Sequence, residues 1–507
     1  ADLYARAIEL GIDDAATLRD ATIALGDALA TAGRGAEAAA VYERARAMVT
    51  DENLAFELSR RVAEQLLQSG YLREGRQAIA TVLQRLGIPY ARSPFIALAR
   101  ALVRKLFVRL RGYGFEVRER EAVLPRDVVR LDVLWTAVRG LMFIDFLRGF
   151  DFQSRYILEA MRVGDRRHLA NGLAAEASSG AASGAKGLLR APILFAKLDQ
   201  VSAPIDDPAV LAHNHSHRSF KHYMAGEFPA ARREGELGMA MYAELCLGVN
   251  WYLSAMRRYL AFSYYYLGDF NELQRRLKPW RGDAHRRADL FAMANMSLGV
   301  SNVSFLIDDD LEGARQDVAR TIARWQIDGF TTQHLQAVIA DVQSDLYEGK
   351  ASDAWRRLEG RWRAIERSLL LKARNLNIEA RHLRARAAIA AALQDKDVSM
   401  LARAEAEVRR LRRDGLDWSR AFAELVAAAI AAQRGDRAQA EMLLRASIDA
   451  FTRIEMQLFA AAARARLGAI VGGAAGETMV AESERAFRAQ GVARPERMIA
   501  MMAPGFA

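Results

Sequence analysis

The sequence predicts an all-α fold, a right-handed superhelical solenoid built from antiparallel helix pairs. Ala, Leu, Arg and Glu, which are strong helix formers, dominate the 507 residues, and only ten residues are proline. Runs that alternate Val, Ile or Thr with polar residues between turns, which are typical of strands, are missing. A helix, a turn with glycine and a second helix recur along the chain instead. An all-helical class follows.

The recurring unit is similar to a tetratricopeptide repeat, whose period is ~34 residues. In this pattern small residues let two antiparallel helices touch, large residues fill the seam, and glycine makes the turn. The first copy consists of Leu25, Gly26, Leu29, Gly33, Ala38, Tyr42 and Ala45. Looser copies consist of Val62, Ala63, Leu66, Gly70, Gly75, Ile79 and Val82, and of Leu260, Ala261, Tyr264, Gly268, Leu273 and Leu277. Further turns are expected at Gly226, Gly349 and Gly435.

By its pattern, the chain divides into three segments that we expect to form one continuous array. Residues 1–92 carry clear repeats, residues 93–205 carry degenerate helical repeats, and residues 206–507 carry repeats that end in capping helices. No linker rich in Pro, Ser or charge separates the segments. Tyr4 and Ala7 match the second helix of a repeat that lacks its first helix, so we expect the chain to be the C-terminal part of a longer protein.

Composition favours a cytoplasmic protein without a transmembrane segment. Cys246 is the only cysteine, so no internal disulfide bond forms and a reducing compartment suits the chain. The longest uncharged stretch, residues 291–307, contains several Asn and Ser residues and is shorter than the roughly 20 apolar residues that a membrane span needs. We therefore expect a buried helix there.

The formal net charge of +10 raises the question of a nucleic-acid or acidic-lipid partner. Arginines are spread along nearly every expected helix instead of being gathered with aromatic residues, so nucleic-acid binding is not expected. The one local concentration of cations lies at residues 100–120. An amphipathic helix packed on its neighbours explains this concentration at least as well as a membrane contact does.

The sequence carries no motif of a catalytic, cofactor-binding or metal-binding site. The glycine-rich stretch 180–187 lacks the spacing and the final hydroxyl residue of a phosphate-binding loop, and no kinase catalytic loop is present. His213, His215, His217 and His222 lie close together, but only His213 and His217 share a helix face, and no Cys or spaced carboxylate completes a zinc site. We therefore expect no catalytic residue, no cofactor and no metal ion.

The first helices of successive pairs predict a concave binding surface, because partner segments usually lie there in such solenoids. Counting back from the turns at Gly226, Gly268 and Gly349 gives its candidate residues. They are His213, Phe220, Tyr223, Arg258, Phe262, Tyr265, Gln343 and Leu346. Exposed aromatic residues and Arg dominate binding hot spots, which favours a peptide or an acidic segment as the partner. The alternative is that these aromatics pack between repeats.

Several short phrases carry a family resemblance. They are Arg148 to Gln153, Trp325 with Asp328 to Phe330, Gln333 and His334, Ala354 to Glu359, Arg367 to Leu370, Arg494 to Met498, and Ala503 to Phe506. In these phrases and over most of its length, the chain resembles the C-terminal helical region of large bacterial serine/threonine protein kinases. Those proteins carry a kinase domain, an AAA-type ATPase module and then tetratricopeptide-like repeats. The resemblance implies that kinase and ATPase activities reside upstream, and it carries over no catalytic residue.

Two functions remain open from the sequence. The first is a non-catalytic sensor or scaffold arm of a multidomain kinase, which binds a protein segment or its own upstream domains in the concave groove. The second is the helical arm of an ATPase-type transcriptional regulator, which binds a small inducer in the same concavity. The sequence does not determine the oligomeric state.

Overall fold

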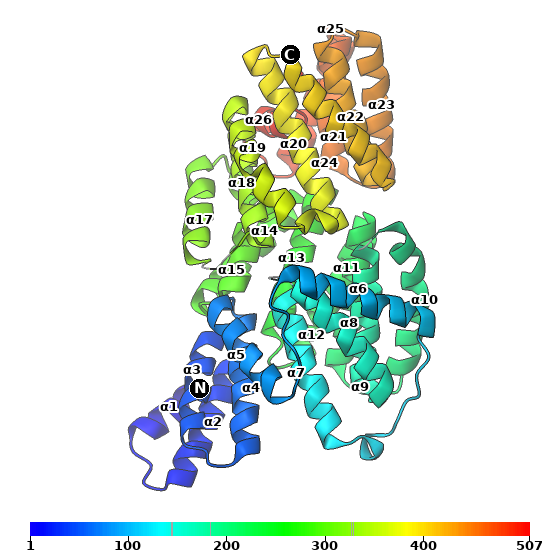
Figure 1. Ribbon diagram of the computed structural model, residues 1–507. Helices are drawn as coiled ribbons and strands as arrows, with labels where there is room; N and C mark the ends of the chain where they lie inside the picture. Colours follow the sequence, from blue (N-terminus) through cyan, green and yellow to red (C-terminus); the bar gives the residue numbers. More distant parts are fainter. Residues whose placement is uncertain (143–144, 183, 326, 328, 507) are drawn as a thin grey trace.

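The fold is all-helical, as the sequence predicts. The computed structural model describes residues 1–142, 145–182, 184–325, 327 and 329–506, and these residues form α-helices and short 3-10 turns, with one isolated β-bridge and no strand (Figure 1). Helices that follow one another in the chain pack together. The right-handed superhelix stays a prediction.

Helices α1–α10 build the end of the molecule that contains the N-terminus (Figure 1). Their bounds are α1 (Asp2–Glu9), α2 (Ala15–Thr31), α3 (Gly35–Ala47), α4 (Glu52–Gln68), α5 (Leu72–Arg85), α6 (Pro94–Arg111), the 3-10 turn η1 (Arg120–Ala122), α7 (Pro125–Met142), α8 (Phe146–Val163), α9 (Arg166–Ala182) and α10 (Ala185–Ser202).

Helices α11–α19 form the middle of the molecule (Figure 1). Their bounds are α11 (Pro208–Ala225), α12 (Phe228–Leu245), α13 (Asn250–Leu267), α14 (Phe270–Arg286), α15 (Leu290–Ser297), the 3-10 turn η2 (Gly299–Asn302), α16 (Val303–Ile307), α17 (Leu311–Arg324), α18 (Thr332–Glu348) and α19 (Ala351–Arg367).

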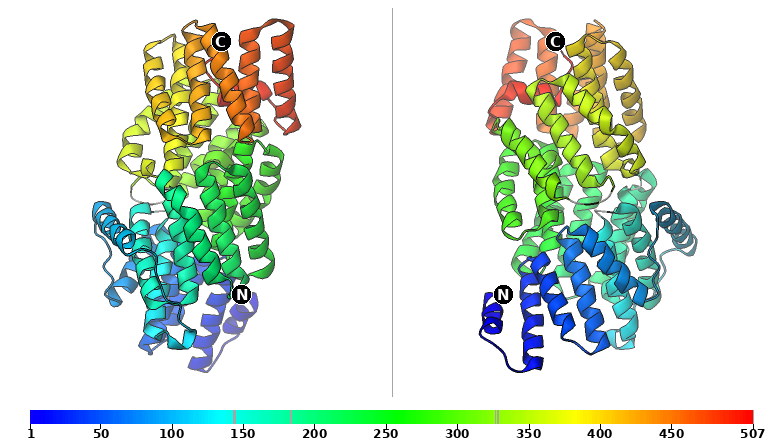
Figure 2. Two further views of the ribbon diagram at one scale, coloured as in Figure 1. Left: turned by 90° about the vertical axis from the view of Figure 1, so that its right-hand side faces the viewer. Right: turned by 60° about the vertical axis from the view of Figure 1, so that its left-hand side comes forward.

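Helices α20–α26 form the opposite end (Figures 1 and 2). After the 3-10 turn η3 (Leu370–Lys372), their bounds are α20 (Arg374–Asp395), α21 (Ser399–Asp414), α22 (Asp417–Gln433), α23 (Arg437–Arg453), α24 (Gln457–Val471), α25 (Gly473–Ala489) and α26 (Pro495–Met502).

The sequence sets many helix ends locally. The carboxylates of Asp14 and Asp310 accept hydrogen bonds from the backbone N–H groups of Thr17 (2.7 Å) and Gly313 (2.8 Å), which satisfies donors that a helix start leaves free. At the other ends, Gly226 adopts φ +77°, a left-handed conformation that glycine adopts without steric cost. These turns return the chain antiparallel to the previous helix.

The N-terminal helices lie against the middle of the chain. The side-chain amide of Asn250, at the start of α13, donates to the carbonyl oxygen of Thr31 at 2.9 Å. The backbone N–H of Phe291, in α15, donates to the carbonyl oxygen of Ser69 at 3.3 Å. The array therefore folds back on itself, and segments about 220 positions apart come into contact.

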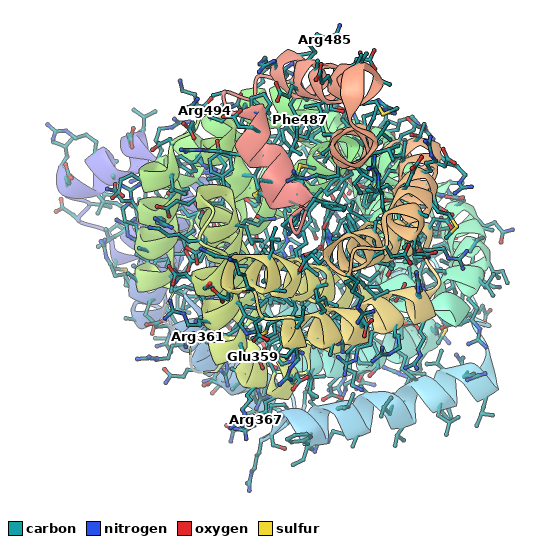
Figure 3. The ribbon with its side chains drawn as sticks, turned by 90° about the horizontal axis from the view of Figure 1, so that it is seen from above. Glu359, Arg361, Arg367, Arg485, Phe487 and Arg494 are labelled. Carbon is teal, nitrogen blue, oxygen red and sulfur yellow. The ribbon has the colours of Figure 1, made fainter. Side chains whose placement is uncertain are left out.

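The C-terminal segment fills the interior of the upper end. Figure 3 shows α26 inside the ring that the neighbouring helices form, and α26 packs on α18, α24 and α25. Met501 and Met502 are fully buried. Arg386 donates to the carbonyl oxygen of Met501 at 2.9 Å, and Gln433 donates to that of Gly505 at 2.9 Å. The chain itself thus occupies part of the concave surface on which we expected a partner segment.

The stretch 291–307 is buried, as expected, but the prediction of one helix there is wrong. It consists of α15, η2 and α16, and the chain bends by 67° between α15 and the following pair. Gly299 adopts φ +62° at the bend, and a Cβ atom there would lie 1.8 Å from the Gln336 side chain on α18. The backbone at Gly299 thus lies so close to α18 that only glycine fits, and its left-handed conformation interrupts the helix. Among the described residues, no single helix is long and apolar enough to span a membrane, and only this bent pair reaches that length and composition together.

Gly226 provides a test of the packing between the middle and the upper end. A Cβ atom at Gly226 would lie 2.4 Å from the Trp418 ring on α22, which is buried. We expect Gly226→Ala to lower the free energy of unfolding by roughly 2–4 kcal/mol, because overpacking adds to the cost of a left-handed alanine. Urea unfolding measures the change.

The matched control is Gly435→Ala. Gly435 has nearly the same φ, +80°, but a Cβ atom there meets nothing within 4 Å. This variant is expected to show only the conformational cost of about 1–2 kcal/mol. Equal losses in the two variants would contradict the packing of Gly226 against Trp418.

Candidate functional site

A cavity of about 180 Å³ lies where α7, α8, α9, α11, α13 and the start of α20 meet, and we call it the central cavity. Most of its wall is apolar or aromatic. Its larger apolar residues are Trp135, Val138, Met142, Phe146, Phe220, Met224, Trp251, Met256, Tyr259 and Leu376. Its polar residues include Arg139, Gln153, Ser178, His213, Ser216, His217, Tyr223, Tyr252, Arg258, Thr332 and Asn375. An apolar cavity with a few convergent polar groups is the usual form of a small-molecule site.

Helical periodicity places the lining residues. On α11, the residues that face the cavity are His213, Ser216, His217, Phe220, Tyr223 and Met224, which recur at intervals of three and four positions. Such a spacing places side chains on one face of a helix. Helices α7 and α13 contribute stripes of the same kind. The cavity is thus the inner surface of several first helices, brought together by the solenoid.

Four of the eight predicted groove residues line the central cavity, namely His213, Phe220, Tyr223 and Arg258. Phe220 packs edge-on against Tyr259, with ring centroids 4.9 Å apart. The Arg258 guanidinium donates to the Asn295 side chain at 3.1 Å and lies over the Phe262 ring. These four residues thus lie together on the wall of the central cavity.

The other four predicted residues, Phe262, Tyr265, Gln343 and Leu346, do not line the central cavity. They are 3 to 4% exposed and lie in the hydrophobic core or against it. Phe262 packs edge-on against Tyr223, with ring centroids 5.4 Å apart, and Gln343 donates to the Tyr265 hydroxyl at 3.5 Å. A partner segment has no access to these side chains in this conformation.

His213 and His217 form a buried relay at one side of the cavity. Their Nε2 atoms lie 3.1 Å apart, and His217 Nδ1 lies 2.5 Å from the Ser178 hydroxyl. The Ser178 hydroxyl also lies 2.7 Å from the carbonyl oxygen of Ala174, which only accepts. Its hydrogen therefore goes to Ala174, and His217 Nδ1 donates to Ser178. His217 Nε2 then accepts from His213 Nε2, which leaves His213 Nδ1 as an acceptor.

Four residues of the cavity wall carry a buried polar atom without a hydrogen-bond partner. The atoms are Arg139 Nε, Gln153 Oε1, His213 Nδ1 and Asn375 Oδ1. The Gln153 amide nitrogen donates to the carbonyl oxygen of Ala175 at 2.9 Å, which fixes Oε1 as the unpaired acceptor. Leaving a buried polar atom unpaired costs roughly 1–3 kcal/mol. These atoms are three acceptors and one donor, and protein atoms cover each of them in this conformation.

Charged groups behind the wall are compensated. Glu64 pairs with Arg60 and Arg139; burial alone would raise its pKa, but the two guanidinium groups hold it at about 2. Glu379 lies behind Tyr223, whose hydroxyl donates to it at 2.6 Å, and burial raises the pKa of this carboxyl. The cavity is thus lined by neutral surfaces and by cations whose charge is partly neutralised.

The geometry does not activate a nucleophile. Ser178 and His217 form a serine–histidine contact, but the serine proton is held by Ala174 within α9, so the histidine does not accept it. Residues 174–178 are helical, so their N–H groups are engaged in the helix and offer no oxyanion hole. Within the described ranges, no three His, Cys, Asp or Glu side chains converge to hold a metal ion. The arrangement is suited to binding.

Sequence reasoning missed Arg139, Gln153, Ser178 and Asn375. The first three lie in the segment 93–205, where the repeat is degenerate. Gln153 belongs to the phrase Arg148 to Gln153, so the family resemblance includes this position but assigns it no role. Asp328, another residue of those phrases, lies outside the described residues.

Compared with known proteins, the chain matches no protein-family model and no curated protein.

The histidine relay makes the stability of the fold sensitive to acid. Burial lowers the pKa of His213 well below its ordinary value and that of His217 to about 4. The unfolded chain binds these protons near pH 6.5, so the stabilisation is complete above about pH 6.5 and is lost as the pH falls toward 4. We expect His217→Gln to remove about 2 kcal/mol of the loss of stability between about pH 7.5 and pH 5.

Urea unfolding at the two pH values measures this loss. His285→Gln serves as the control, because His285 is an exposed histidine on α14. It is expected to retain the acid sensitivity of the wild type. If His217→Gln loses as much stability between the two pH values as the wild type does, protonation of the two histidines does not destabilise the fold.

Proposed function

We propose that this chain is a non-catalytic sensor domain that binds a small, largely apolar molecule in the central cavity. The observation that carries the proposal is the combination of an aromatic wall with four unpaired buried polar atoms. A cavity kept for packing alone would be filled by side chains, since interiors are close-packed. A ligand would satisfy the unpaired atoms once the side chains that cover them move on binding, which would offset their cost.

The unpaired atoms define the chemical class of the ligand. Gln153 Oε1, Asn375 Oδ1 and His213 Nδ1 are acceptors, so the ligand donates hydrogen bonds to them. Arg139 Nε is a donor and takes one acceptor atom of the ligand. Flat aromatic groups suit the wall of Trp135, Trp251 and other rings. An aromatic molecule with amine, amide or hydroxyl groups meets these requirements.

Occupancy would act on the relative positions of three parts of the chain. The walls come from α7, α8 and α9, from α11 and α13 in the middle, and from the start of α20. A ligand that contacts all three stabilises one arrangement of them over the others. In the context that the family resemblance implies, this bias would be transmitted to upstream kinase or ATPase domains. The alternative context is an ATPase-type transcriptional regulator with a DNA-binding segment, and the upstream reading frame distinguishes the two.

Binding of a protein segment, or of the chain's own upstream domains, in the concave groove stays a prediction. Part of the concave surface is occupied by α26, and Phe262, Tyr265 and Leu346 are buried. A pull-down with the whole parent protein, with and without this chain, tests that function. Loss of partners on deletion of the chain would support it.

A cavity-filling variant tests the proposed sensor. Ala255 lines the cavity from α13, and Ala255→Phe places a ring in the space. We expect this variant to lower the affinity for N-phenyl-1-naphthylamine, a neutral aromatic probe with one N–H donor, by at least ~10-fold, because the ring removes the contacts that the probe makes. Fluorescence titration measures the affinity.

Ala438→Phe is the matched control, because Ala438 is an exposed helical alanine on α23. This variant is expected to bind the probe as the wild type does. Circular dichroism and urea unfolding check that both variants are folded. Unchanged probe affinity in a folded Ala255→Phe variant would refute the central cavity as the binding site.

A further inference from the structure

The outward side of α6 is apolar throughout, and we call it the outer face of α6. Its residues are Phe95, Ile96, Ala99, Leu102, Val103, Leu106, Phe107 and Leu110. They recur at intervals of three and four positions, which places them on one side of the helix. All are exposed, from 43% for Ile96 to 78% for Leu110 among the large side chains. A continuous exposed apolar surface marks an interaction site.

The opposite side of α6 holds the helix on the molecule. Ala97, Ala101 and Val108 are buried, and α6 packs on α8. Arg104 pairs with Asp151 on α8, and Lys105 pairs with Glu176 on α9. These contacts fix the orientation of α6, so its outer face points away from the protein (Figures 2 and 3).

Cations border the outer face on both sides. At 100° per residue, Arg100 and Arg111 lie along one edge and Arg109 along the other. The ion pairs of the described residues include none with Arg109 or Arg111. No Asp or Glu occurs in α6. The surface is therefore an apolar stripe with the exposed Arg109 at one edge and the exposed Arg111 at the other.

This charge pattern distinguishes between possible occupants. A second copy of α6 laid on the first would bring arginine edges together, and like charges along such a seam oppose pairing. An anionic lipid surface instead offers hydrocarbon to the stripe and phosphate groups to both arginine edges at once. The stripe is also a ridge that projects from the molecule rather than a groove that would receive a peptide (Figure 2).

We propose that the outer face of α6 binds the surface of membranes that contain anionic lipids. The helix lies in the plane of the interface, with Leu106, Leu110 and their neighbours inserted about 5–10 Å into the boundary between headgroups and acyl chains. The exposed side chains of Arg109 and Arg111 extend along its edges to the lipid phosphates. The contact is peripheral and leaves the central cavity on the protein side.

Co-sedimentation with vesicles tests this surface. The full chain is mixed with vesicles of phosphatidylcholine alone or of phosphatidylcholine with phosphatidylglycerol. We expect binding to the anionic vesicles that weakens as salt is raised, and at least ~10-fold weaker binding to the neutral vesicles. The double variant Leu106→Glu and Leu110→Glu is expected to lose binding to both, because it places charge in the apolar stripe.

Two matched variants separate the apolar and the charged parts of the surface. Met442→Glu, at an exposed helical methionine on α23, is expected to bind like the wild type. The double variant Arg109→Gln and Arg111→Gln is expected to lose the preference for anionic vesicles while keeping the fold, because both side chains are exposed. A wild-type chain that binds neither vesicle overturns the proposal.

The alternative occupant of the outer face of α6 is a second copy of the chain, and a measurement of the oligomeric state tests it. Light scattering after gel filtration shows whether the free chain is dimeric and whether the Leu106→Glu and Leu110→Glu variant becomes monomeric. A dimer that depends on the outer face of α6 assigns this face to a second copy and overturns the membrane proposal. A monomer whose vesicle binding depends on the same residues supports it.

Discussion

The stacking of aromatic rings at the end of α13 holds the middle of this molecule against its upper end, which α20–α26 form. Tyr266 stacks on Phe228 with ring centroids 4.7 Å apart, and it meets Trp418 at 5.3 Å and Phe459 at 6.2 Å. Each fully buried ring stabilises the fold by roughly 1.5–3 kcal/mol. Glycine is required at Gly226 because its turn presses directly on Trp418. Without these contacts, the middle helices and α22–α24 would share little apolar surface.

The central cavity is a gap in the packing of the array. Helices α7, α8, α9, α11 and α13 meet around a space of about 180 Å³ that their side chains do not fill. The walls combine rings with polar atoms that the protein does not satisfy. Unsatisfied polar atoms destabilise a fold. A bound molecule that forms hydrogen bonds with them would remove this destabilisation.

Arginine has two different roles in the chain. Many arginines that appear as a general basic surface in the sequence bridge neighbouring helices. Arg384 contacts Glu407 at 3.0 Å and Glu359 at 2.8 Å, and Arg374 contacts Asp414 at 2.9 Å. Such pairs neutralise charge within the array. The arginines at the edges of the outer face of α6 differ, because α6 carries no carboxylate that could neutralise them. The excess positive charge is therefore found on this side of the molecule.

The sequence by itself determined the helical class and the local register of the clear repeats. Helix propensity, aspartate caps and turn glycines act over a few residues, so counting back from Gly226 and Gly268 groups His213, Phe220, Tyr223 and Arg258, which line the central cavity. Only the tertiary structure decided whether an inner stripe faces a cavity, a core or a partner. That choice depends on how far apart helices from distant segments come to lie. Tyr265 and Leu346 became core because α24 and α26 lie near them, whereas Gln153 and Asn375 came to line the cavity from segments over 200 positions apart.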